Sequence, residues 1–129
     1  MTDSSTNQTI IYKDLSYAVV GLAMEVYNEL GYGFLEKVYE NAIMVAFQDA
    51  GIPAEQQESI PVYFRGKQVG EYFSDILAEG KIILELKSIE AINEVHFAQI
   101  IHYLKATNLK VGLIINFGKD TLEHKRVVL

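Results

Sequence analysis

Apolar residues recur at helical spacing in two segments of the first fifty residues. A spacing of three or four residues places side chains on one face of an α-helix, so the pattern predicts helices over 11–30 and 35–50. The expected inward positions of the first helix are Leu15, Val19, Leu22, Val26 and Leu30, and those of the second are Leu35, Val38, Ala42, Val45 and Ala46. Gly31 and Gly51 follow these segments, as glycine commonly follows a helix C-terminus.

From residue 59 the pattern changes to β-type. Strands are predicted over 59–64, 69–78 and 82–87, separated by the turns Arg65-Gly66-Lys67 and Glu79-Gly80-Lys81. A helix over 94–107, with Val95, Ala98, Ile101 and Leu104 on one stripe, precedes a nearly continuous apolar run over 110–117 that is typical of a strand buried on both faces. Residues 125–129 add a candidate edge strand. The strand-helix-strand step from 82 to 117 predicts a right-handed crossover between parallel strands.

The composition is that of a globular domain. The chain has 129 residues, which predicts a single domain over 11–129 after a disordered tail over 1–10. It has no cysteine, no apolar segment long enough to span a membrane and no visible secretory signal, so a cytoplasmic location without membrane association is expected. The net charge of −6 counts against strong non-specific DNA binding.

The candidate chemistry lies in the second and third predicted strands. Glu85 and Lys87 are two apart in a strand and therefore share a face. If the Glu79-Gly80-Lys81 loop has three residues, Asp75 lies opposite Glu85 on that same face, and this register keeps like residues with like. Two carboxylates and an ammonium on an otherwise apolar sheet form a site that a Mg²⁺ ion would stabilise. The alternative from spacing alone is a structural ion pair between Lys87 and either carboxylate.

Two helices carry further candidates. Gln99 and Tyr103 are spaced i, i+4 on the helix after the third strand, with His96 on the same side. This polar stripe either leans over the site, on the substrate side, or faces solvent. Glu36 lies in the first turn of the second helix, where the helix dipole alone favours a carboxylate.

Several phrases of the sequence together resemble a known family. Residues 33–39 read G-x-x-E-x-x-Y, and E-L-K, H-F-A-Q-x-x-x-Y-L-K and G-L-I-I-N-F-G follow in order. From about residue 17 to 117 the chain resembles the GxxExxY family of the PD-(D/E)XK nuclease superfamily. The resemblance implies an α/β fold with a restriction-endonuclease-like αβββαβ core, a mixed sheet flanked by helices, and an extra N-terminal helix.

The resemblance also implies roles for individual residues. Asp75 and Glu85 would be metal ligands for Mg²⁺ (or Mn²⁺), Glu36 a further carboxylate at the metal, and Lys87 the catalytic lysine. Gln99 and Tyr103 would line the pocket. Ser74 stands where the superfamily pattern has proline, and every charged position of the pattern is filled.

Two functions follow as hypotheses. The first is a metal-dependent nuclease that hydrolyses phosphodiester bonds of DNA or RNA. The alternative is a non-catalytic nuclease-like module for binding or assembly, which the acidic charge and small size favour. The fold analogy also suggests a homodimer, since nucleases often cut two strands with two copies.

Overall fold

The computed structural model describes residues 10–129, so the predicted tail over 1–10 lies, apart from Ile10, outside the described residues. The elements in chain order are α2 (Lys13–Leu30), α3 (Glu36–Ala50), β1 (Ala54–Phe64), β2 (Lys67–Ala78), β3 (Ile82–Lys87), α4 (Glu94–Thr107), β4 (Val111–Asn116) and β5 (Glu123–Val128). This order confirms the predicted α/β class with an additional N-terminal helix. Within the described part of the chain, no helix is long and apolar enough to cross a membrane.

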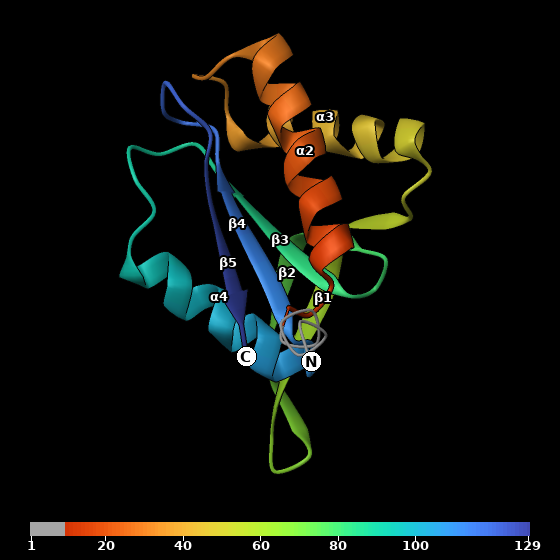
Figure 1. Ribbon diagram of the computed structural model, residues 1–129. Coiled ribbons are helices and arrows are strands. Elements are labelled where there is room, and N and C mark those ends of the chain that lie inside the picture. Colours follow the sequence, from red (N-terminus) through yellow and green to blue (C-terminus); the bar gives the residue numbers. More distant parts are fainter. Residues whose placement is uncertain (1–9) are drawn as a thin grey trace, which may run out of the picture.

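The five strands form one mixed sheet in the order β1-β2-β3-β4-β5. Only β3 and β4 are parallel, as the helical crossover between them predicts; the other neighbours are antiparallel. Figure 1 shows α2 and α3 on one side of the sheet and α4 on the other. Each face of the sheet therefore has its own apolar core, and the central strands β3 and β4 contribute to both.

The turn between β2 and β3 has the predicted length. Ala78 pairs with Ile82, Leu77 with Ile83 and Ile76 with Leu84, which leaves a three-residue loop over 79–81. Glu79 and Gly80 adopt positive φ angles of 51° and 65°, a conformation that glycine takes without strain. The register that places Asp75 opposite Glu85 is thus the observed one.

The buried face of α3 differs from the prediction. Leu35 and Val45 were expected inward but are 80% and 58% exposed, whereas Tyr39, Ile43 and Phe47 are fully buried against the sheet. The Tyr39 ring stacks on Phe117 with centroids 4.3 Å apart. The helix is therefore rotated so that its aromatic stripe, which carries more apolar area than the predicted stripe, faces the core.

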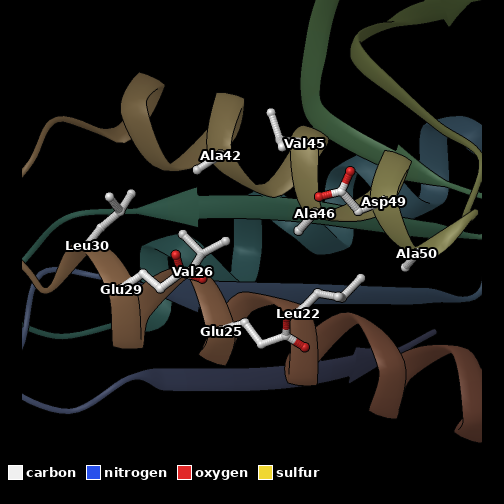
Figure 2. Close-up of a pocket in the computed structure, with 10 residues that line it drawn as sticks. All are labelled: Leu22, Glu25, Val26, Glu29, Leu30, Ala42, Val45, Ala46, Asp49 and Ala50. Carbon is white, nitrogen blue, oxygen red and sulfur yellow. The ribbon is translucent and has the colours of Figure 1, made fainter.

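Several apolar residues of α2 and α3 that were predicted to face the core line an open groove between the two helices. Leu22, Val26 and Leu30 of α2 lie across it from Ala42, Val45 and Ala46 of α3, as Figure 2 shows. Its volume is about 560 Å³. The inward-facing prediction for α2 holds for Val19 and Val26 and fails for Leu30, which is exposed. In α4 the predicted stripe also fails at its start, since Val95 is exposed and the buried side chains are Ile100, Tyr103 and Leu104.

β1 begins five residues earlier than predicted. Its first part, Ala54–Glu58, has no apolar alternation and is nearly all exposed. It is a strand because its backbone pairs with β2, starting from Ala54 opposite Ala78. A polar edge strand of this kind is invisible to a hydrophobic pattern, because its partner supplies the hydrogen bonds and its side chains face water.

Gly118, two residues after the end of β4, gives a test of this packing. A Cβ at this position would overlap the backbone nitrogen and oxygen of Ile89, which cannot move aside as a side-chain tip can. We expect Gly118→Ala to lower the free energy of unfolding by about 2–3 kcal/mol, measured by urea denaturation. The control is Gly21→Ala in the exposed part of α2, where a Cβ meets nothing. That change should raise the free energy of unfolding by up to about 1 kcal/mol. Equal effects at both positions would contradict the close packing of Gly118 against the Ile89 backbone.

Candidate active site

Asp75 lies where the backbone pairing of β2 is interrupted on both sides. The β1–β2 register skips Gln57 and Asp75, and Gln57 has a φ of 56°. On the other side, the β2–β3 ladder ends at Ile76 and Leu84. Side chains continue the connection: the Asp75 N–H donates to Glu85 Oε2 at 3.0 Å, and the Leu86 N–H donates to Asp75 Oδ2 at 2.7 Å. Two carboxylates thus replace the backbone ladder at this end of the strand pair.

Lys87 is connected to α4 on the same face of the sheet. Ile83 packs in the α4-side core, so strand alternation places Glu85 and Lys87 on that side. The Lys87 Nζ donates to Gln99 Oε1 at 3.3 Å, and the Gln99 Nε2 donates to the Tyr103 hydroxyl at 3.0 Å. The structure therefore brings together the strand lysine and the two polar residues of the helix that sequence reasoning selected.

The structural ion pair considered as the alternative is not formed. Within residues 10–129 the ion pairs shorter than 4 Å are Lys37–Glu40 and Lys81–Glu79. Asp75 and Glu85 are hydrogen-bonded to backbone N–H groups, and Lys87 is hydrogen-bonded to an amide. The Lys87 ammonium thus lies on the face of the two carboxylates without neutralising either by direct contact.

Burial and mutual repulsion make the two carboxyl groups hard to ionise together. Glu85 is only 5% exposed, and its burial, together with the charge of Asp75, raises its pKa to about 8. Burial also raises the pKa of Asp75, a change that the Leu86 N–H opposes and the nearby Glu40 reinforces. The two groups titrate as a pair, so one of them retains a proton at neutral pH when no cation is bound.

Glu40 belongs to the surroundings of the site, although sequence reasoning did not select it. It is 4% exposed on α3, and its carboxylate accepts hydrogen bonds from the side-chain amides of Gln56 and Gln57 and from Lys37. Its charge raises the pKa of Asp75. The sequence feature that could have identified Glu40 is its position four residues after Glu36, which places both carboxylates on one face of the helix.

Glu36 reaches this region because the loop before α3 is fixed to the end of β3. The Tyr39 hydroxyl donates to Gly31 O at 2.7 Å and accepts from the Phe34 N–H at 3.1 Å. Ser88 Oγ, one residue beyond Lys87, donates to Phe34 O at 2.7 Å. The tyrosine of the G-x-x-E-x-x-Y motif therefore holds the loop that positions its glutamate.

The structure does not gather Glu36 into a closed set of ligands. Glu36 is exposed, and its charge is among the causes that raise the pKa of Asp75 and Glu85. In residues 10–129 no group of three or more His, Cys, Asp or Glu side chains is arranged to hold a metal ion. Asp75 and Glu85 are thus two side-chain ligands that would need backbone, water or substrate oxygens to complete a coordination sphere.

His96 has a local role at the start of α4. Its Nδ1 accepts the Asn93 N–H at 3.1 Å, while the Asn93 side chain accepts the Val95 N–H at 3.0 Å, which together form a capping box. The hydrogen-bonded chain from Lys87 runs through Gln99 and Tyr103 and does not include His96. The predicted substrate-side role of His96 stays a prediction.

The raised pKa of Glu85 makes the stability of the metal-free protein depend on pH. A carboxyl group with a raised folded-state pKa destabilises the fold as pH rises from its unfolded value, 4.5, to its folded value, about 8. We expect Glu85→Gln to be close to the wild type at pH 5 and more stable by about 1–2 kcal/mol at pH 8, measured by thermal unfolding in a chelator. An equal difference at both pH values would show that Glu85 does not titrate in this range.

Comparisons with known proteins agree with this geometry. A family model described as the PD-(D/E)XK nuclease superfamily matches residues 13–127. A search of curated proteins finds no match. The crystal structure of SSO0001 is similar, with a TM-score of 0.50 and 14% identity over 85% of this chain and 65% of that chain, a likeness that concerns the fold alone. Because the family model extends over nearly the whole chain and the mixed sheet is restriction-endonuclease-like, the chain belongs to the PD-(D/E)XK nuclease superfamily.

Proposed function

We propose that this protein is a metal-dependent nuclease with Asp75, Glu85 and Lys87 at its active site. The observation that carries the proposal is that two carboxylates, the half-buried Asp75 and the buried Glu85, replace the β2–β3 backbone hydrogen bonds, with Lys87 on the same face. Burying two adjacent carboxylates is unfavourable unless a cation binds there. Membership of a nuclease superfamily supports the same function.

The donor set fits Mg²⁺ or Mn²⁺. Both carboxylates offer hard oxygen atoms, and the pKa of each is raised in a way that a bound cation would reverse. The Leu86 carbonyl, on the residue whose N–H binds Asp75, is our candidate for a third ligand, and Glu36 is our candidate for a further carboxylate. A bound divalent ion would supply Lewis acidity toward a phosphoryl oxygen and lower the pKa of a coordinated water.

The protein's own residues have distinct tasks in this proposal. Lys87, fixed at the end of β3 through Gln99, stabilises the negative charge that develops on the phosphoryl oxygen as water attacks phosphorus. The attack forms one P–O bond and breaks the ester bond to the leaving oxygen, which takes up a proton. Tyr103 holds Gln99 from the other side and borders the substrate.

Metal binding and cleavage test the proposal together. We expect Mg²⁺ and Mn²⁺ to bind the wild type in calorimetric titrations and not Glu85→Ala. Lys87→Ala should retain metal binding and lose at least about 100-fold in the rate of nucleic-acid cleavage, since one charge-stabilising donor is removed. Lys81→Ala, in the loop between β2 and β3, is the matched control and should cleave normally. Cleavage by pure protein that survives both Glu85→Ala and Lys87→Ala would rule out this site.

Finer assignments extend the proposal. Within the superfamily we assign the chain to the GxxExxY group, on residues 33–39 and the roles of Tyr39 and Ser88 in fixing that motif at the site. A homodimer, which would place two active sites on one duplex, and a cytoplasmic location belong to the same proposal. Sedimentation analysis of the purified chain measures the oligomeric state.

A second candidate function, assembly with another protein, is favoured by the groove between α2 and α3. Among the described residues lining it, seven are apolar and three are acidic, namely Glu25, Glu29 and Asp49, and none is basic. The charge pattern fits a basic amphipathic helix of a partner protein, with its apolar face in the groove and its lysines or arginines at the acidic rim. A second copy would bring like charges together.

The assembly candidate predicts binding that does not depend on metal. A helical peptide of leucine and lysine heptads should bind the wild type and Asp75→Asn equally in a chelator. Val45→Glu, which places a charge in the groove, should weaken this binding at least tenfold, whereas Val69→Glu on the β1–β2 hairpin should not. A wild-type dimer that Val45→Glu dissociates would instead make a second copy the occupant of the groove.

A further inference from the structure

A second cavity borders the active site on its α4 side. It has a volume of about 510 Å³, a size typical of ligand sites. Three tyrosines from three elements contribute to its wall, namely Tyr63 of β1, Tyr72 of β2 and Tyr103 of α4. The remaining lining residues are Pro61, Val62, His102, Lys105 and Ala106. The wall is therefore mainly aromatic and apolar, with two nitrogen-bearing side chains.

The tyrosine rings offer faces to a ligand. Tyr72 and Tyr103 are neighbours with centroids 5.5 Å apart and planes inclined by 42°. Tyr103 is buried, whereas Tyr72 and Tyr63 are more than half exposed. Large aromatic side chains exposed next to one another on a sheet commonly mark a binding surface. Tyr103 thus forms a fixed floor, and the other two rings remain accessible.

The charge at this cavity is opposite to that of the whole chain. No acidic residue is found among the described residues that line it, although the chain has a net charge of −6. Lys105 lines it directly, and Arg65 and Lys67 lie at the tip of the β1–β2 hairpin, next to Tyr63 and Phe64 at the end of β1. Figure 1 shows this hairpin, in yellow-green, extending beyond the rest of the sheet. The region therefore combines aromatic faces with cationic side chains.

Tyr103 joins this cavity to the active site. Its ring lines the cavity, and its hydroxyl accepts from Gln99, which in turn binds Lys87. Lys87 and a residue of the cavity wall are thus connected through one intervening side chain, that of Gln99. The cavity is therefore adjacent to Lys87.

We propose that this cavity is a base-stacking subsite, which we call the tyrosine subsite (Tyr63, Tyr72 and Tyr103), and that the substrate is single-stranded nucleic acid at this point. The inference rests on the proposed nuclease function. Every nucleobase has a π-face that stacks on an aromatic ring, and the phosphates between bases fit the adjacent Lys105. In a continuous duplex these faces are covered by neighbouring bases, so only an unpaired or splayed nucleotide can use the subsite.

Binding to strands with and without bases tests the subsite. Fluorescence anisotropy with metal-free protein compares a labelled twelve-residue oligothymidylate, the corresponding oligouridylate, and an abasic strand with the same number of phosphates. We expect tighter binding of at least one base-containing strand than of the abasic strand, by about tenfold or more. Tyr72→Leu should remove that preference. Tyr17→Leu, an equally conservative change at an exposed tyrosine of α2, should leave it intact.

The outcomes separate this inference from the proposed function. Equal binding of strands with and without bases by the wild type would overturn the tyrosine subsite even if the protein cleaves nucleic acid. An unchanged preference in Tyr72→Leu would overturn it as well. Conversely, the wild type could prefer base-containing strands, lose that preference in Tyr72→Leu, and yet cleave none of the strands with Mn²⁺. This result would support the subsite and count against nuclease activity.

Discussion

The reciprocal hydrogen bonds between β2 and β3 at Asp75 are the interaction on which the site depends. A buried and a half-buried carboxylate would ordinarily destabilise a sheet, but here each accepts a backbone N–H that the interrupted ladder would otherwise leave unpaired. The backbone and the side chains therefore satisfy one another. As a result the carboxylates are already held in place, which would lower the cost of organising the metal site that we propose. The remaining electrostatic cost appears as the raised pKa values of both groups.

The two helical layers deliver their polar groups to the same end of the sheet by different means. On one side, α4 packs on the face that carries Lys87 and presents Gln99 and Tyr103 one turn apart, so a single helix face supplies both. On the other side, α3 cannot lean over the same face. Its first turn reaches the strand end through the loop that Tyr39 and Ser88 fix, and Glu40 contributes charge from within the core. Polar groups held through rigid elements on both sides are typical of preorganised sites.

The sequence could predict the parts of the site that depend on local periodicity and turn length. Strand alternation and the three-residue loop were enough to place Asp75 opposite Glu85, because a two-residue turn would pair Asp75 with Leu84 and mix polar and apolar residues on one face. It could not predict Glu40, because the partners that make its burial possible, Gln56 and Gln57, lie on a polar edge strand with a positive φ at Gln57. The rotation of α3 was also missed, since the preference for Tyr39 over Leu35 depends on Phe117, nearly eighty residues away. The helical period offered two apolar stripes on this helix, and the contact with Phe117 favours the one that faces the sheet.

The net charge is another property of the sequence that does not predict the local features of the structure. A value of −6 counts against binding to phosphates only if the charge is spread evenly over the surface. In this protein it is not: the groove between α2 and α3 is lined by three carboxylates and no base, whereas the tyrosine subsite is lined by Lys105 and His102 and no acid, among the residues described. The two surfaces lie on opposite sides of the sheet. At ionic strengths where the Debye length is about 10 Å, dissolved salt therefore weakens the effect of the acidic groove on a ligand at the tyrosine subsite. The net charge therefore does not describe every surface of the molecule, and the tyrosine subsite, which no acidic residue lines among those described, is compatible with a polyanionic substrate.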